Sequence, residues 1–270
     1  MTTSLSTDVV PATQFAIEGP FWSLDGRTPF RSLFTTRIAG TSNGAYDSLN
    51  LALHVGDDPR RVRENRRLIF DASGLNSSLA VIAQQVHGAS VAVVSEDDAG
   101  CGCFSHADAI PGVDALVTRS KNLPLMCFSA DCLLLGLSDP KAGVLAILHA
   151  GWRGMAAGVI ENTISTMRDQ GADPANIHAV GAPSIGPCCF EVGSEVVSAL
   201  GAEHVAQPLD TKAMYNLRKA AQSRLEFSGV RHLHIDATCT CCRGDLFFSH
   251  RRAVRKGEKH TGRMAMVVWQ

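Results

Sequence analysis

The chain has 270 residues, 45% of them hydrophobic, which is enough for the core of one large domain. Its 25 Lys and Arg against 26 Asp and Glu give a net charge of -1, which excludes a polyanion-binding protein and an acidic solvating tail. The first residues have neither the basic nor the apolar segment of a signal peptide, and every apolar run is far shorter than the ~20 residues of a membrane helix. We therefore expect a soluble, cytoplasmic protein.

Short apolar or β-branched runs between turn residues predict strands along most of the chain. In order they cover residues 33–36, 80–86, 90–94, 115–118, 144–149, 177–181, 232–235 and 264–269. Helices are predicted at 60–72, where Asp58 and Pro59 form a start signal, then after Gly154, at 194–200 and at 212–227.

The order of these elements predicts an α+β fold. Strands outnumber helices and do not alternate with them, which favours one layered domain with mixed β-sheets over a doubly wound parallel sheet. With no repeat and no linker, we expect a flexible N-terminal tail over residues 1–18 and a single catalytic domain over 19–270. The chain has no P-loop motif and no GxGxxG after a strand, so ATP and dinucleotide cofactors are not indicated.

Three separate segments each offer a soft-metal ligand: His87 in QVHG, Cys132 in ADC, and His149 at the start of HAGWRG. Zinc held by three protein ligands keeps a fourth position open, as in catalytic sites. Taken singly, His87 is better explained as a surface residue at the turn after the strand 80–86, and Cys132 is better explained as a core cysteine. The run after His149 is harder to explain by packing. A strand, a glycine turn and a helix at this point would present the cation of Arg153 and an aromatic ring beside the histidine.

Other polar residues border the apolar segments. Asp131 precedes a long apolar run and needs a partner if it is buried; it is a candidate proton shuttle, or a carboxylate that orients a histidine ligand. Arg37 and Arg153 are candidates for binding an anion, because a guanidinium group can bind it with two parallel hydrogen bonds. Asn50 is a candidate for the substrate pocket. Surface placement is the alternative for Arg37 and Asn50, and a solvated loop is the favoured interpretation of the basic run 251–256.

Nine cysteines in a chain without a secretory signal argue against a disulfide framework. The sequence has a CxxC from Cys239 to Cys242 and an adjacent pair, Cys188 and Cys189. The four could form a structural zinc site only if the fold brings them together, and adjacent cysteines chelate one metal poorly. Free cysteines acting as small buried apolar residues are therefore the favoured interpretation.

Two imidazoles and a thiolate suit zinc and also copper. A multicopper oxidase needs several HxH pairs, whereas this chain has ten histidines and a single HxH, from His232 to His234. We therefore expect Zn²⁺ and disfavour a copper-type polyphenol oxidase.

In this order, the motifs resemble those of the YfiH/laccase-domain family, whose members are labelled polyphenol oxidase in older usage and purine nucleoside phosphorylase more recently. The matching segments are TTR at 35–37, SLNL at 48–51, HVGD at 54–57, QVHG at 85–88, ADC at 130–132, HAGWRG at 149–154, IGPCCFEVG at 185–193, FFSHRR at 247–252 and TGR at 261–263. The resemblance implies a layered α+β, cysteine-hydrolase-like fold and a zinc ion bound by His87, Cys132 and His149. It also implies phosphorolysis of adenosine, inosine, guanosine and methylthioadenosine, with adenosine deamination at the same site.

The partners to expect are a nucleoside and phosphate, with no nucleic acid and no membrane, for a monomer or small homo-oligomer. Two other classes stay open. One is a thiol hydrolase with Cys132 as nucleophile and His149 as base, which includes the editing of cell-wall precursors. The other is a non-enzymatic redox or metal-binding protein, suggested only by the nine cysteines.

Overall fold

The computed structural model describes residues 17–18, 20–23 and 29–270. The predicted tail 1–18 lies outside them except for its last two residues, which form β1 (Ile17–Glu18). In the described part of the chain, no helix is both long and apolar enough to cross a membrane.

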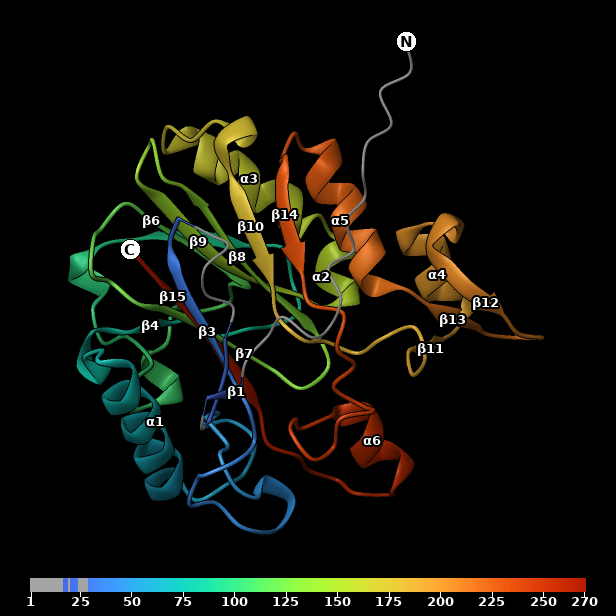
Figure 1. Ribbon diagram of the computed structural model, residues 1–270, viewed down its shortest axis with the longest axis horizontal. Helices are drawn as coiled ribbons and strands as arrows, with labels where there is room; N and C mark the ends of the chain where they lie inside the picture. Colours follow the sequence, from blue (N-terminus) through green and yellow to red (C-terminus); the bar gives the residue numbers. More distant parts are fainter. Residues whose placement is uncertain (1–16, 19, 24–28) are drawn as a thin grey trace.

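Two six-stranded sheets form the centre of the molecule (Figure 1). In spatial order, the first contains β1, β2 (Phe21–Ser23), β3 (Arg31–Thr35), β15 (Met264–Trp269), β7 (Leu125–Ser129) and β4 (Val81–Ile82). The second contains β14 (His232–Ile235), β10 (His178–Gly181), β8 (Leu133–Asp139), β9 (Val144–Ala150), β6 (Ala115–Thr118) and β5 (Val91–Val94). Both sheets mix parallel and antiparallel pairs.

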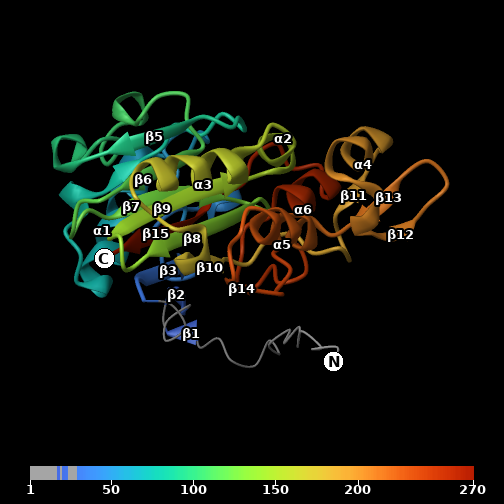
Figure 2. The ribbon, with the colours of Figure 1, turned by 90° about the horizontal axis from the view of Figure 1, so that it is seen from above.

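The helices are α1 (Pro59–Ser73), α2 (Trp152–Ala156), α3 (Val159–Asp169), α4 (Ser194–Leu200), α5 (Leu217–Phe227) and α6 (His250–Arg255). A small third sheet, of β11 (Glu191–Val192), β13 (Ala213–Tyr215) and β12 (Val205–Pro208), projects with α4 at the end opposite α1 (Figure 2).

The alternation of side chains along β8 and β9 explains the layers. Leu135 and Leu148 pack with α3 and α5 on one face, whereas Leu134 and Ile147 pack on the other face against the first sheet. Gly136 lets the sheets approach, because a Cβ there would lie 2.8 Å from Val268. On its far side the first sheet packs against α1. The result is a layered α+β architecture, as the sequence predicts.

Several predicted elements differ from those observed. The strand predicted at 80–86 is reduced to β4, because the Gln85 side chain replaces a strand partner and exchanges two hydrogen bonds with the backbone of Phe128, at 2.7 and 2.8 Å. The helix predicted at 212–227 begins only at Leu217, because Asn216 caps it and the preceding residues form β13. The prediction of a solvated loop at 251–256 is wrong, since most of this run forms α6.

Asn65 on α1 holds the loop between β3 and α1 in place. Its side chain is fully buried, accepts a hydrogen bond from Thr41 N at 2.7 Å and donates to Asn50 O at 2.8 Å. We expect Asn65→Ala to lower the free energy of unfolding by about 3 kcal/mol, because buried backbone groups lose their partners. Urea unfolding of the variant and the wild type measures this loss of unfolding free energy. The exposed variant Arg67→Ala on the same helix should unfold close to wild type, and equal midpoints for both variants would contradict this role of Asn65.

Candidate metal centre

The three predicted ligands meet at one end of the sheets. Cys132 lies in the turn between β7 and β8, and His149 lies near the end of β9. His87 lies in the loop after β4, five residues beyond the end of the strand rather than at its end as predicted. One ligand atom from each residue lies within 4.8 Å of the other two. His149 is buried, Cys132 is partly buried and His87 is exposed, so the site opens on the His87 side.

The pairing of β8 with β9 brings Cys132 and His149 together. The register places Leu133 opposite Ala150 and Leu134 opposite His149, so Cys132 reaches the start of the turn after β9. The two imidazole rings lie edge to face, with centroids 4.8 Å apart. The side chains thus converge on one point from three separate segments.

Asp114 fixes the two histidines, and the sequence analysis did not identify it. Its fully buried carboxylate accepts hydrogen bonds from His149 Nδ1 at 2.8 Å, His87 N at 3.0 Å and Gly88 N at 2.7 Å. A carboxylate at Nδ1 fixes the tautomer and leaves Nε2 free for a metal. In the sequence, Asp114 could have been found because it lies directly before an apolar run, the one that forms β6. Asp131 was selected by the same kind of position.

The glycines of HAGWRG make room for the site. A Cβ on Gly151 would lie 3.1 Å from Cys132 Sγ and 3.4 Å from His87 Cδ2, where it would crowd a bound ligand. A Cβ on Gly154 would lie 2.7 Å from Gly88 O, in the loop that carries His87. Both positions therefore need glycine because of close approach, at Gly151 to the candidate ligands and at Gly154 to the backbone of the loop that carries His87.

The electrostatics prepare the site for a cation. Burial by itself raises the pKa of the Cys132 thiol, but the neighbouring His149 and His87 outweigh it and lower the pKa to about 6. Burial lowers the pKa of His149, but Cys132 and Asp114 together raise it to about 9. The pair is thus the thiolate of Cys132 beside the imidazolium of His149. A metal ion that binds both side chains can replace the proton of the imidazolium as the positive charge next to the thiolate.

The donor set fits zinc. Bonds of about 2.0–2.3 Å to a central ion would place tetrahedral ligand atoms about 3.3–3.8 Å apart, which is compatible with the compact cluster observed. Three protein ligands leave a position for water or substrate. The described residues contain one other group of three or more possible ligands, and it consists of cysteines alone.

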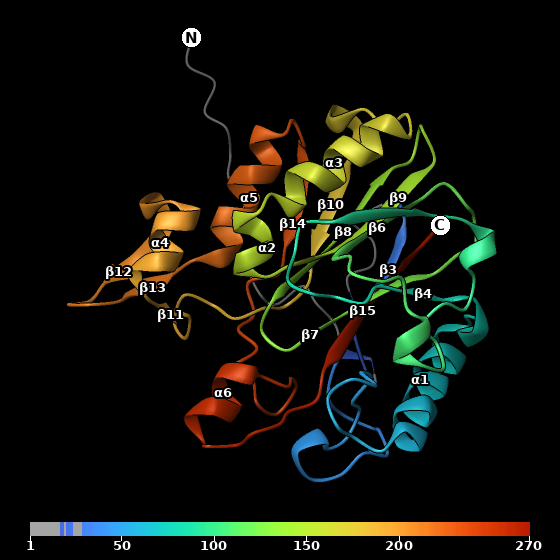
Figure 3. The same ribbon diagram turned by 180° about the vertical axis from the view of Figure 1, so that it is seen from behind.

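A cavity of about 310 Å³ lies beside the ligands. Its walls combine ligands, aromatic rings and cations: His87, Ala130, Asp131, Cys132, Trp152, Arg153, Ile185, Phe190, Leu217, His250 and Arg251. Arg153 stacks on Trp152 at 4.3 Å, and Arg251 lies 5.8 Å from the Phe190 ring. The helices α2 and α6, which carry Trp152, Arg153, His250 and Arg251 of this wall, lie on the same side of the sheets as β11 (Figure 3). A cavity of this size suits a small molecule.

Asp131 forms part of the cavity wall but does not orient a histidine. One oxygen accepts from Thr240 Oγ1 at 2.7 Å, and the other accepts from Ser249 Oγ at 2.9 Å and Arg251 N at 2.7 Å. The role of orienting a histidine therefore belongs to Asp114, and that alternative for Asp131 is wrong. Its role as a proton shuttle stays a prediction, although three donors leave its carboxylate little capacity to accept a further proton.

Arg37 and Asn50 lie outside this cavity. The Arg37 guanidinium donates to the backbone oxygens of Asp47 and Gly244, and lies 4.7 Å from the Phe248 ring. Asn50 is fully buried and bonds to Asp57 Oδ2 at 2.9 Å. Their predicted contact with substrate stays a prediction that this placement does not support, whereas Arg153 lines the cavity.

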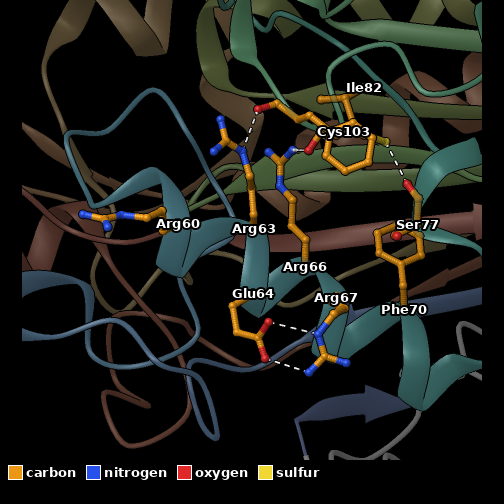
Figure 4. Close-up of a pocket in the computed structure, with 10 residues that line it drawn as sticks. Arg60, Arg63, Glu64, Arg66, Arg67, Phe70, Ser77, Ile82 and Cys103 are labelled. Carbon is orange, nitrogen blue, oxygen red and sulfur yellow. Dashed lines mark hydrogen bonds and ion pairs between the residues drawn. The ribbon is translucent and has the colours of Figure 1, made fainter.

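A larger cavity, of about 380 Å³, lies beside α1 (Figure 4). Its arginines are already engaged. Arg66 is almost fully buried and donates to three backbone oxygens, Arg63 donates to Phe104 O, and Arg67 pairs with Glu64. These contacts tie the loop around residue 103 to the helix, so we assign this cavity no catalytic role.

Comparisons with known proteins converge on one group. A family model described as multi-copper polyphenol oxidoreductase laccase matches residues 31–270. The purine nucleoside phosphorylase YlmD of Geobacillus stearothermophilus is 35% identical over 267 residues, covering 94% of this chain and 96% of that protein. Adenosine deaminase RL5, from an unknown prokaryotic organism, is 36% identical over 238 residues, covering 84% and 91%. The crystal structure of YlmD from Geobacillus stearothermophilus superposes with a TM-score of 0.88 at 32% identity, covering 95% of this chain and 98% of that one.

Proposed function

The chain belongs to the multi-copper polyphenol oxidoreductase laccase family, also called the YfiH/laccase-domain family, and on that premise we propose that it is a zinc-dependent purine nucleoside phosphorylase that also deaminates adenosine. The observation that carries the proposal is the convergence of His87, Cys132 and His149 within 4.8 Å at the edge of a 310 Å³ cavity. The proposed substrates are phosphate with adenosine, inosine, guanosine or methylthioadenosine.

Zinc is favoured over the copper that the family description names. The site has one thiolate and two imidazoles, and the two histidines of the single HxH, His232 and His234, lie on β14 and do not line the cavity. No described group of ligands resembles a multi-copper assembly, which needs many histidines.

In phosphorolysis, a phosphate oxygen bonds to C1′ of the ribose while the bond from C1′ to the purine nitrogen breaks. A zinc ion at His87, Cys132 and His149 would supply a Lewis acid. Arg153 and Arg251 lie on the cavity wall, and their guanidinium groups match phosphate geometry. Trp152 and Phe190 offer apolar faces that exclude water from a flat ring. The imidazole of His250 is available in the same wall to hand a proton to the departing purine.

Deamination in the same cavity would need another reactant and another orientation of the nucleoside. Water replaces phosphate and attacks C6 of adenine, and the amino group leaves as ammonia. An adenosine that enters with its base toward Cys132 places C6 near the metal ligands, whereas one that enters with its ribose first places C1′ there. Two binding orientations would thus give two reactions in one site.

A thiol hydrolase is the second candidate, because the lowered pKa of Cys132 and the raised pKa of His149 describe an activated nucleophile and its base. In that mechanism Asp114 would orient His149 through Nδ1 as the third member of a triad, but the mechanism has no use for the imidazole of His87. The metal centre uses all four groups and is therefore favoured.

Product analysis tests the proposal. The zinc-loaded protein is incubated with adenosine, with and without phosphate, and the products are separated by mass-resolved chromatography. Adenine with ribose 1-phosphate would establish the phosphorylase, and inosine formed without phosphate would establish the deaminase. Unchanged adenosine from a chain shown to contain zinc would contradict the proposal.

We expect Arg153→Ala to raise the KM for phosphate by about 10- to 100-fold, because a charge-assisted hydrogen bond of about 1.5–3 kcal/mol is lost. Zinc content and deamination should change far less, since neither involves phosphate. Initial rates against phosphate concentration measure the effect, with the exposed Arg168→Ala on α3 as matched control. An unchanged KM for phosphate in Arg153→Ala would assign phosphate binding to another residue.

A further inference from the structure

A second group of metal-ligating side chains lies apart from the three ligands of the first centre. The Sγ atoms of Cys188, Cys189, Cys239 and Cys242 all lie within 4.8 Å of one another. Cys242 Sγ is 3.5 Å from both Cys188 Sγ and Cys189 Sγ. Four thiolates around zinc, with bonds of about 2.3 Å, would be about 3.8 Å apart, whereas a disulfide needs about 2.05 Å. We propose that these four cysteines bind one structural zinc ion, separate from the catalytic centre.

The backbone brings the cysteines together by contacts that do not involve their sulfur atoms. Ser184, in the loop after β10, forms a parallel bridge with Cys239, in the loop after β14. Thr240 N donates to Ser184 O at 3.1 Å. Two loops some 50 residues apart in sequence are thus fixed side by side, with one cysteine pair on each.

The loops also present donors and space to the sulfur atoms. Gly186 N donates to Cys239 Sγ at 3.1 Å, a type of bond that supports metal-bound thiolates. A Cβ on Gly186 would lie 3.1 Å from Cys239 Cβ and 3.3 Å from Cys188 Sγ, so a side chain at this position would crowd the cluster.

Charge supports a zinc tetrathiolate, whose formal charge is about -2. Four arginines surround the two loops through backbone contacts. Arg251 and Arg255 donate to Cys189 O, Arg252 donates to the carbonyl oxygens of Thr240 and Cys241, and Arg218 donates to Thr238 O. In the described part of the chain none of these four forms an ion pair with a carboxylate. A dianionic centre at the four cysteines would offset about half of their positive charge.

Other roles for the four thiols fit less well. The interpretation as buried apolar residues is wrong for Cys188 and Cys242, which are exposed. Disulfides would use the thiols in pairs, whereas all four sulfur atoms share one compact cluster. A cluster of several irons needs sulfurs spread around a larger core than 4.8 Å allows. The turn at residues 187–189 overcomes the poor chelation expected of adjacent cysteines, because it directs both sulfur atoms toward Cys242.

The position of the cluster indicates what the zinc would do. Ile185 and Phe190, on either side of Cys188 and Cys189, line the catalytic cavity. Ile185 N donates to Asp131 O at 2.8 Å, and Thr240 on the second loop donates to the Asp131 carboxylate. One ion would therefore clamp both loops behind the cavity wall and hold Phe190 in place without touching substrate.

Metal counting tests the inference without any need for turnover, so its failure and a failure of the proposed function are distinguishable. The protein is purified with reductant and without oxygen, and zinc per chain is measured by mass spectrometry. We expect two zinc ions in the wild type and one in Cys132→Ala. We also expect one in Cys188→Ser/Cys242→Ser, a double variant at exposed positions, and two in the neighbouring control Cys241→Ser.

Cobalt provides a second readout. Cys132→Ala loaded with Co²⁺ should show the intense thiolate-to-cobalt charge transfer and d–d bands of a tetrahedral tetrathiolate site. These bands should disappear when Cys188→Ser and Cys242→Ser are added. A zinc-free Cys132→Ala, cobalt bound without these bands, or a disulfide among the four cysteines in non-reducing peptide mass spectrometry would each overturn the inference.

Discussion

Replacing Cys132 by Ala is expected to abolish phosphorolysis and deamination together, by at least about 10³-fold in kcat, and to remove one zinc ion per chain. The thiolate is the one anionic ligand of the centre, and loss of a bound Lewis acid removes several kcal/mol of transition-state stabilisation. The side chain is partly exposed and its removal leaves the β8–β9 pairing intact, so the variant should fold. Zinc content and rates with adenosine and phosphate measure the effect.

His87→Ala separates the metal mechanism from the thiol mechanism. It keeps the Cys132–His149 pair but removes one ligand, so we expect it to lose zinc and activity in parallel. A thiol hydrolase would retain turnover in this variant and lose it in Cys132→Ala. Unchanged turnover in Cys132→Ala would contradict both assignments of this residue.

The second large effect is expected for Asp114→Asn. The carboxylate accepts hydrogen bonds from His149 Nδ1 and from three backbone N–H groups, those of residues 86, 87 and 88. An amide has only one acceptor oxygen, and its NH₂ group would face a backbone N–H in a fully buried position. We expect zinc affinity to fall by about 10- to 100-fold, because the ligand histidines lose their orienting partner. We also expect the free energy of unfolding to fall by about 3 kcal/mol.

Competition with a chelator of known affinity measures the first effect, and urea unfolding of the zinc-free protein measures the second. The exposed Asp108→Asn is a matched control that should leave both unchanged. Wild-type zinc affinity in Asp114→Asn would show that the histidines are oriented without this carboxylate.

The sequence was sufficient to predict the fold class and to select three residues that the fold brings together as candidate metal ligands. Isolated apolar runs bounded by turn residues fixed β6, β14 and β15 to the residue, because each is a single short strand with no competing pattern. Among the three candidate ligands, only the segment of His149 stood out by itself, because packing did not account for the glycines around Trp152 and Arg153. In the structure, a Cβ on either glycine would crowd the candidate ligands or the loop that carries His87.

The partners of the ligands could not be predicted. Asp114 and Asp131 both precede buried strands and look equivalent in the sequence. Only the pairing of β6 with β9 places Asp114 beside His149, whereas Asp131 faces Thr240 and Ser249 from segments more than a hundred residues away. The sequence analysis disfavoured a zinc site at the four cysteines for the same reason, since their geometry depends on two loops that the pairing of β10 with β14 brings together.

Return of zinc to the metal-stripped protein tests most directly whether turnover depends on a metal at His87, Cys132 and His149. Phosphorolysis of adenosine is measured as zinc is added back to the wild type and, in parallel, to Cys132→Ala, with copper as the alternative ion. We expect no turnover before addition, recovery in proportion to the zinc bound by the wild type, and none in the variant. Full turnover of the stripped protein, or recovery in Cys132→Ala, would contradict a catalytic metal at these three residues.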